Sequence, residues 1–289
     1  APGRPAAAGP RGGAKTPQVV QLKKYTRGIT NHGRQCSWQQ AITMLRQMQH
    51  EGLPPNVITY NATIMACEKA QQWPTALELL RQMQFSRVQP DVISYNALIS
   101  ACGKGKRWAL ALNMLETMRR EGLRPNLITY STMINAGQKG QQWAMALELL
   151  QEMRQEAIQP DSIAYNSTIS ACGRGLQWIV GLQLLAQMRQ ERVKPTVITY
   201  TAAIAASERG RQWTLALRLL TEMKQERVQP DVITCTSVIG ACGRCQQWQW
   251  APHLLREMRQ DGLSPDRVAY GATVSALEKG RQWALALDV

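Results

Sequence analysis

Short polar side chains recur along this sequence at a fixed interval of 35 residues. One set contains only Asn, Ser and Thr, and its members are Asn61, Asn96, Ser131, Asn166, Thr201 and Thr236. A second set follows each of these 30 residues later, directly behind a proline, and its members are Asp91, Asn126, Asp161, Thr196, Asp231 and Asp266. Such side chains offer hydrogen-bond donors and acceptors close to the backbone. They can recognise the polar edge of a ligand, but they also form turns and cap helices, so both roles stay open.

Positive charge follows the same interval. Each repeat carries one cation at an equivalent place, in the series Arg34, Lys69, Lys104, Lys139, Arg174, Arg209, Arg244 and Lys279. A cation at the end of a helix is favourable by roughly 0.3–1 kcal/mol, and a regular line of cations also suits a chain of phosphates. The 34 Lys and Arg against 20 Asp and Glu give a net charge of +14. This balance favours a polyanionic partner, nucleic acid before an anionic membrane surface, although a basic, well-solvated surface is the alternative.

A helix is expected to position the first polar set. In residues 57–91, Tyr60, Ile64 and Cys67 have the spacing of one helical face. The place of Ala70 is Gly in most repeats, which predicts that this helix stops there.

A second helix follows in the same repeat. Its predicted apolar stripe begins with a tryptophan and consists of Trp73, Ala76, Leu77, Leu80 and Met83. Pro74 falls in its first turn, where the missing N–H is tolerated.

Each repeat is therefore a helical hairpin that must stack on its neighbours to bury its apolar face. The 289-residue chain contains full repeats at 57–91, 92–126, 127–161, 162–196, 197–231 and 232–266. A degenerate repeat at 22–56 precedes them, and a partial one at 267–289 ends without a polar cap, from which we expect truncation. Residues 1–21 are rich in Ala, Gly and Pro and are basic, as in a flexible arm or a transit-peptide remnant.

The recurring string P-D-V-I-T/S-Y-N-x-x-I-x-A-C-x-K/R-G-x-x-W-x-x-A-L-x-L-L-x-x-M resembles the pentatricopeptide repeat family from residue 22 to the end. Its tryptophan departs from the aliphatic residue that is commoner there. The resemblance implies an all-α fold, a right-handed α-solenoid superhelix of stacked antiparallel helical hairpins. It also implies sequence-specific binding of single-stranded RNA, with one nucleotide per repeat.

The resemblance assigns roles to these periodic residues. The fifth and last residues of each repeat, which are the two polar sets above, would read the base edge, and the cations from Lys69 to Lys279 would contact phosphates. The second residue would pack against the base, in the series Ile58, Ile93, Ile128, Ile163, Ile198 and Ile233, with Val268. Packing at the helix entry is the alternative role for these apolar residues.

The family's pairing rule predicts a target. Asn with Asp favours U, Asn with Asn favours C, and Ser or Thr with Asp favours G. Asn166 with Thr196 reads a pyrimidine, and Thr26 with Asn56 would favour A if the degenerate repeat binds at all. The expected site is 5′-(A)-U-C-G-Y-G-G-3′, read from the N- to the C-terminal repeat.

Other chemistry has little support in the sequence. Cys67, Cys102, Cys172 and Cys242 share one place and are expected in the core, and the tryptophans are expected within the second-helix layer rather than against bases. The lone Cys242–Cys245 pair and the three scattered His predict no metal site. No catalytic residue, cofactor, small-molecule substrate or membrane span is expected. Trp250 lies outside the register.

The expected function is thus RNA binding in organellar RNA metabolism, in stabilisation, processing, editing or translation of a transcript, without catalysis by this chain. The family resemblance places the protein in a plastid or a mitochondrion, with possible protein partners in RNA processing. Two alternatives remain, a protein–protein interaction scaffold and the RNA-binding part of a longer RNA-processing enzyme.

Overall fold

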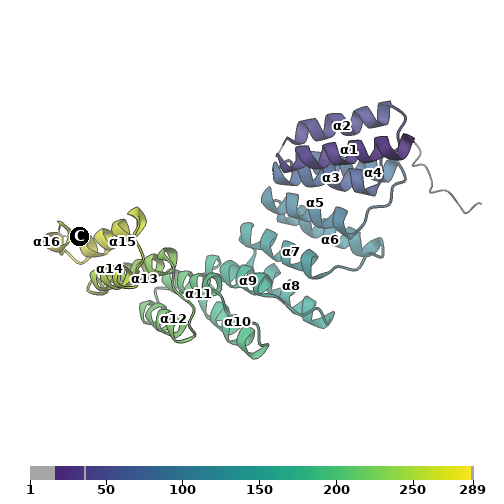
Figure 1. The fold of residues 1–289 in the computed structure, drawn as a ribbon. Helices are drawn as coiled ribbons and strands as arrows, with labels where there is room; N and C mark the ends of the chain where they lie inside the picture. The colour runs from purple at the N-terminus through teal and green to yellow at the C-terminus, as the bar shows by residue number, and fades with distance from the viewer. Residues whose placement is uncertain (1–16, 36, 288–289) are drawn as a thin grey trace, which may run out of the picture. The chain divides into compact units, whose positions relative to one another are not determined.

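A computed structural model describes residues 17–35 and 37–287, which form sixteen α-helices and no strand (Figure 1). The helices alternate as the first and second helix of each repeat. The first helices are α1 (Pro17–Arg34), α3 (Val57–Lys69), α5 (Val92–Lys104), α7 (Leu127–Lys139), α9 (Ser162–Arg174), α11 (Val197–Arg209), α13 (Val232–Arg244) and α15 (Arg267–Lys279). The second helices are α2 (Trp38–His50), α4 (Trp73–Phe85), α6 (Trp108–Arg120), α8 (Trp143–Gln155), α10 (Trp178–Gln190), α12 (Trp213–Gln225), α14 (Trp250–Gln260) and α16 (Trp283–Leu287).

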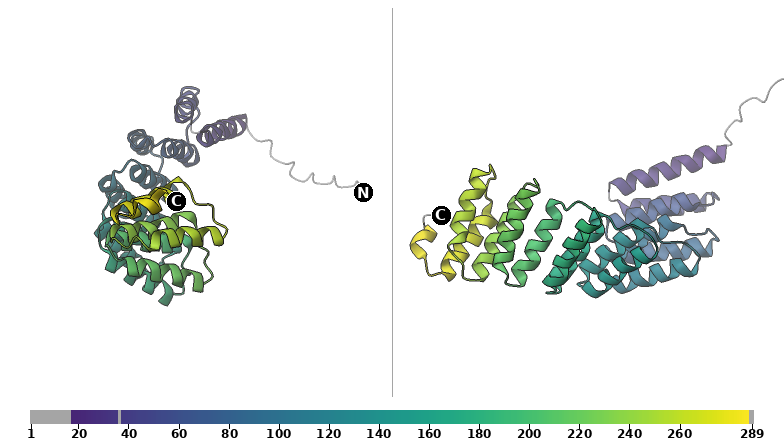
Figure 2. Two further views of the ribbon diagram at one scale, coloured as in Figure 1. Left: turned by 90° about the vertical axis from the view of Figure 1, so that its left-hand side faces the viewer. Right: turned by 90° about the horizontal axis from the view of Figure 1, so that it is seen from below.

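The chain divides into two compact parts, and the boundary between Ala101 and Cys102 falls within α5. In the N-terminal part, α1 packs on α2 and α3, and α3 packs on α4. In the C-terminal part, the first helices from α7 to α15 pack on one another in chain order, and each packs on its own second helix. Figure 2 shows the hairpins following one another in chain order within each part. The predicted all-α solenoid of stacked hairpins is confirmed.

The core lies between the two helix layers. Tyr60, Ile64 and Cys67 are fully buried, as their helical spacing predicts. In the second helix, Ala76 and Met83 are also fully buried. Leu79 is buried as well, while Leu77 of the predicted stripe is half-buried.

Polar side chains join successive repeats at the end where each second helix finishes. Arg154 of α8 donates from Nη2 to the Tyr165 hydroxyl of α9 at 2.7 Å, and this hydroxyl donates to Glu191 at 2.7 Å. Burial and the hydrogen bond to Glu191 raise the pKa of Tyr165 to about 12 against the opposing effect of Arg154. The phenol therefore stays protonated near neutral pH. The same Arg–Tyr contact recurs between Arg119 and Tyr130, Arg189 and Tyr200, and Arg259 and Tyr270.

The glycines at the ends of the first helices have a different role from the one predicted. Gly140 has a φ of −81°, so it does not adopt the left-handed conformation of a glycine helix stop. The next residue, Gln141, adopts that conformation with a φ of 60°. A Cβ on Gly140 would come within 2.6 Å of Cδ1 of Trp108. Glycine is needed there because the indole of the preceding repeat lies against it.

One second helix starts later than predicted. Trp248 has the place that opens this helix in the other repeats, but α14 begins at Trp250. Pro252 explains the shift, because it cannot donate the N–H that a helix starting at Trp248 would require at that place. Starting at Trp250 puts the proline in the first turn. Trp250 itself makes an edge-to-face contact with His253, with ring centroids 5.8 Å apart.

The first helix, α1, begins at Pro17, so the last residues of the predicted arm 1–21 are helical. The rest of that predicted arm, residues 1–16, lies outside the described residues. Among the helices that the structure describes, none is long and apolar enough to cross a membrane.

Candidate nucleic-acid interface

One face of each first helix from α3 to α15 carries an exposed apolar side chain at its second residue. The exposed fraction of these side chains ranges from 57% at Ile93 to 67% at Ile198, and the series is Ile58, Ile93, Ile128, Ile163, Ile198, Ile233 and Val268. The helical period explains the exposure, since the second residue faces away from the buried tyrosine and isoleucine of the same helix. This exposure does not favour the alternative role, packing at the helix entry. An exposed apolar side chain repeated at one place indicates a binding surface.

Successive second-place side chains border a slot. In the N-terminal part, a cavity of about 420 Å³ lies between Ile58 and Ile93, and Asn61 and Asp91 line it. Two of the periodic cations, Arg34 and Lys69, line the same cavity. Apolar walls, a polar pair and positive charge thus meet in a single slot.

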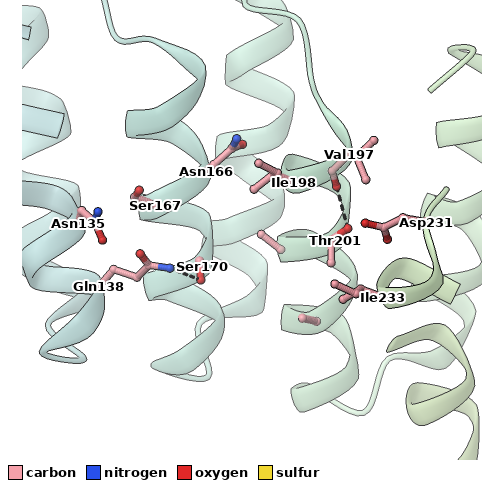
Figure 3. A pocket seen from close by; sticks show the side chains of 12 residues that line it. Asn135, Gln138, Asn166, Ser167, Ser170, Val197, Ile198, Thr201, Asp231 and Ile233 are labelled. Carbon is pink, nitrogen blue, oxygen red and sulfur yellow. Dashed lines mark hydrogen bonds between the residues drawn. The ribbon is translucent and has the colours of Figure 1, made fainter. Parts of the chain in front are cut away.

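The C-terminal part contains an equivalent slot. A second cavity of about 420 Å³ is bordered by Ile198 and Ile233, with Thr201 and Asp231 between them (Figure 3). Asn166 of the preceding repeat also lines this cavity. The same repeat places therefore build the slot in both parts of the chain.

Fifth and last residues are hydrogen-bonded to each other in two of the repeats whose fifth residue is Asn. The amide Nδ2 of Asn61 donates to Oδ1 of Asp91 at 3.0 Å, and Nδ2 of Asn166 donates to Oγ1 of Thr196 at 3.4 Å. Thr201 lines the slot with Asp231, but its hydroxyl donates to the backbone oxygen of Val197.

The other fifth residues lie on their first helices. Thr236 donates to its own helix, at the oxygen of Val232, as Thr201 does in its helix. Ser131 is half-buried on α7, and Asn96 is half-buried on α5. The last residue of each full repeat lies directly before the next first helix.

The last residues cap these helices. Asp91, for example, accepts the Ser94 N–H at 2.8 Å, and all six last residues accept the N–H three residues later, namely Asp91, Asn126, Asp161, Thr196, Asp231 and Asp266. Capping is therefore confirmed, and two of these side chains, Asp91 and Asp231, also line the slots. Partial burial would raise the pKa of the Asp91 carboxyl, but hydrogen bonds from Ser94 and Asn61 outweigh it and hold this pKa below its ordinary value.

The periodic cations terminate the first helices, as expected. Each first helix ends at its cation, from Arg34 of α1 to Lys279 of α15. All are exposed except Lys104, which is half-buried. Arg244 is held by Glu208, with Nε 3.1 Å from Oε1. Burial raises the pKa of Glu208, and Arg244 and Arg209 oppose that shift.

The first repeat differs from the others. A cavity of about 520 Å³ beside α1 is lined by Thr26 and Asn56, the fifth and last residues of this degenerate repeat. Lys23 lines it in the place where the other repeats have an apolar residue, together with Arg27 and Arg34. This cavity has the polar pair and the positive charge of the other slots, but a cation replaces one apolar wall.

The structure also brings in residues that the sequence interpretation passed over. The hydroxyl of Ser94, the third residue of its repeat, donates to Oδ1 of Asn61 at 2.5 Å. The sequence did contain a signal, since Ser or Thr occupies this third place in most repeats. A polar side chain near the helix end also links neighbours, as Gln138 donates to Ser170 at 2.6 Å.

The other singled-out residues lie away from the slots. Trp108 packs on the following repeat at Gly140, which agrees with a structural role for the tryptophans. Cys67, Cys102, Cys172 and Cys242 are fully buried, as predicted, and burial raises the pKa of the Cys242 thiol to about 12. Among the described residues, no cluster of His, Cys, Asp and Glu could hold a metal ion.

Stacked helical hairpins with a repeated slot define the chain as an α-solenoid of the helical-repeat class. The sequence patterns named "PPR repeat family", "Pentatricopeptide repeat domain" and "PPR repeat" match it, at residues 90–139, at 43–105, 180–209 and 218–279, and at 128–158, 163–193 and 198–228. The chain belongs to the pentatricopeptide repeat family. A search of curated proteins finds no significant match.

Solved structures with this fold are similar over most of the chain. The pentatricopeptide repeat protein PPR10 from maize aligns with 93% of this chain at a TM-score of 0.56 and 23% identity. This chain spans 45% of the length of that protein. The pentatricopeptide repeat domain of Arabidopsis thaliana protein-only RNase P 1, solved in complex with tRNA, aligns with 59% of this chain and 90% of its own length, at a TM-score of 0.52 and 18% identity.

Proposed function

We propose that this chain binds single-stranded RNA with one nucleobase in each slot. The slot between Ile58 and Ile93 carries the proposal, because it combines exposed apolar walls with the Asn61–Asp91 pair. A flat base has two apolar faces and a polar edge, so it matches apolar walls around a hydrogen-bonding pair. Lys69 in the same slot supplies positive charge for the adjoining phosphate.

Base selection would follow from the hydrogen-bonding groups in each slot. The Asn61 amide has a second Nδ2–H beyond the one given to Asp91, and this donor suits a carbonyl oxygen of U. Thr201 with Asp231 presents a hydroxyl and a carboxylate, which the family's rule associates with G. Together the slots would read 5′-(A)-U-C-G-Y-G-G-3′ from the N- to the C-terminal repeat.

The biological setting belongs to the same proposal. Family membership supports a role in organellar RNA metabolism, in a plastid or a mitochondrion, where binding would protect, remodel or mark a transcript. The chain itself would bind rather than catalyse. Similarity to a tRNA-bound domain of a protein-only RNase P is consistent with RNA as the ligand, while identity of 18% limits that similarity to the fold.

A binding titration tests this function. Fluorescence anisotropy would compare the predicted oligoribonucleotide with an oligoribonucleotide of the same composition in shuffled order and with the corresponding single-stranded DNA. We expect the predicted RNA to bind most tightly. Equal affinity for the shuffled RNA would contradict base reading, and failure to retain any RNA at low salt would favour the interaction-scaffold alternative.

A further inference from the structure

We propose that a third-place Ser or Thr that contacts the fifth residue of the preceding repeat is a positioning residue for base selection in that repeat. This inference rests on the proposed function, since it concerns how the fifth residue is presented to a base. It assigns to the hydroxyls of Ser94, Thr199 and Thr234 a role beyond helix capping.

Ser94 fixes the orientation of the Asn61 amide. Its hydroxyl donates to Oδ1 of Asn61 at 2.5 Å, while Nδ2 of Asn61 donates to Oδ1 of Asp91 at 3.0 Å. Ser94 is fully buried and Asn61 is 7% exposed. Because an ionised carboxylate can only accept, the NH₂ end of the amide must face Asp91 and its oxygen must face Ser94. One N–H of the amide then remains for a ligand, at a fixed place in the slot.

The same contact recurs in the C-terminal part of the chain. The hydroxyl of Thr199 donates to Oδ1 of Asn166 at 2.6 Å, whereas the contact of Asn166 with its last-place partner Thr196 is longer, at 3.4 Å. The Thr234 hydroxyl lies 2.7 Å from that of Thr201. The third residue thus holds the fifth residue of the preceding repeat in three slots, whether that residue is Asn or Thr.

Two repeats provide a natural contrast, because their third residue is alanine. Ala164 follows the slot of Ser131, and the buried Ser131 oxygen has no hydrogen-bond partner among the described residues. Ala269 follows the slot of Thr236, whose hydroxyl donates to the backbone oxygen of Val232, as the Thr201 hydroxyl does to that of Val197, but has no third-place hydroxyl beside it. Asp161 and Asp266 still cap their helices in these repeats. Capping therefore does not require a third-place hydroxyl, and the Ser131 hydroxyl lacks the contact that the fifth residues Asn61, Asn166 and Thr201 have.

A fixed side chain presents a base with one arrangement of donors and acceptors, whereas a free one can turn to suit several bases. Removing the third-place hydroxyl should therefore reduce discrimination between bases more than it reduces affinity. One hydrogen bond sets the scale, which is a loss of selectivity of about threefold to tenfold.

The test measures the affinity of the chain for four RNAs that differ only in the nucleotide facing repeat 57–91. Ser94→Ala should lower the preference for U at that nucleotide, and Ser94→Thr, which keeps the hydroxyl, should restore it. Thr59→Ala is the matched control. Thr59 is the third residue of its own repeat, and its N–H donates to the capping side chain of Asn56. The fifth residue of the preceding repeat, Thr26, donates to the backbone oxygen of Leu22. This control should lower stability as Ser94→Ala does and leave the preference for U unchanged.

The reverse change supplies a gain of function. Ala164→Thr would give the Ser131 hydroxyl a partner, and selectivity for the nucleotide facing repeat 127–161 should rise. If the wild type discriminates between bases and neither Ser94→Ala nor Ala164→Thr changes that selectivity, the role of the third residue is overturned while the proposed function stands. A wild type that does not discriminate between bases would instead contradict the proposed function. If Ser94→Ala does not fold, Thr199→Ala tests the same role at the slot of Asn166.

Discussion

Trp108 lies against Gly140 of the following repeat so closely that no side chain fits between them. A Cβ on Gly140 would meet the indole at Cδ1, Cγ and Cβ, at 2.6, 3.0 and 3.2 Å. The same contact recurs between Trp143 and Gly175, between Trp178 and Gly210, and between Trp248 and Gly280. In these four repeats the indole therefore packs directly against the glycine backbone.

Gly140→Ala should therefore destabilise the C-terminal part of the chain. An added methyl group in a tight contact costs typically 1–3 kcal/mol, which exceeds the gain of up to about 1 kcal/mol from replacing glycine. The measurement is the urea midpoint of unfolding. Gly271→Ala is the control, because a Cβ there meets nothing within 4 Å and should stabilise α15. Equal midpoints for Gly140→Ala and the wild type would contradict a packing role for this glycine.

Most of the fold could be predicted because one pattern repeats without insertion. The face formed by Tyr60, Ile64 and Cys67 is set by local helical geometry, and the structure buries all three. The role of Gly140 could not be predicted from the repeat. A glycine at a helix end has the same sequence signature whether it turns the chain or accommodates a neighbour, and only the packing of Trp108 distinguishes the two.

The candidate site was predictable in its residues but not in its network. Asn61 and Asp91 are identified by the repeat, and their hydrogen bond agrees with that pairing. The contact of Ser94 with Asn61 joins residues 33 apart in neighbouring repeats, so the recurrence of Ser or Thr at the third place indicates a role there but does not identify the partner. Pro252 shows the reverse case, since the repeat predicted a helix start at Trp248 that a single proline moves to Trp250.

Asn61→Ser should change the base that repeat 57–91 prefers. The substitution replaces an amide by a hydroxyl beside the same Asp91, and that pair matches the combination associated with G. We expect preference at this nucleotide to shift from U toward G, measured by competition between RNAs that differ only there. Preference at the nucleotide facing Thr201 serves as the internal control. If U remains preferred after the substitution, Asn61 does not read the base.

The salt dependence of RNA binding should show whether the periodic cations contact phosphates. About seven phosphate contacts predict a slope of roughly −5 for log K against log salt, from about −0.7 per phosphate on single strands. Lys139→Gln should make this slope less negative by about 0.7, since it removes one contact. Arg218→Gln on α12 is the control, because this exposed cation lies on a second helix. A wild-type slope near zero would contradict phosphate binding by the periodic cations.

Ile198→Ala should separate RNA affinity from stability. Ile198 is 67% exposed at the border of its slot, so its truncation should change the free energy of unfolding by no more than about 0.5 kcal/mol. A base packed on this side chain would lose apolar contact, and stacking contacts of this kind contribute about 1–3 kcal/mol per base. We take the lower end for an aliphatic wall and expect affinity for the predicted RNA to fall about fivefold.

Ile204→Ala is the matched control for that substitution, because Ile204 is fully buried in the same helix. It should lower the free energy of unfolding by about 2–5 kcal/mol, as expected for a buried aliphatic side chain. Below the unfolding transition, its affinity for RNA should stay near that of the wild type. Affinity that tracks stability in both variants would mean that Ile198 acts through the fold. Loss of affinity in Ile198→Ala alone would assign this exposed side chain to the bound base.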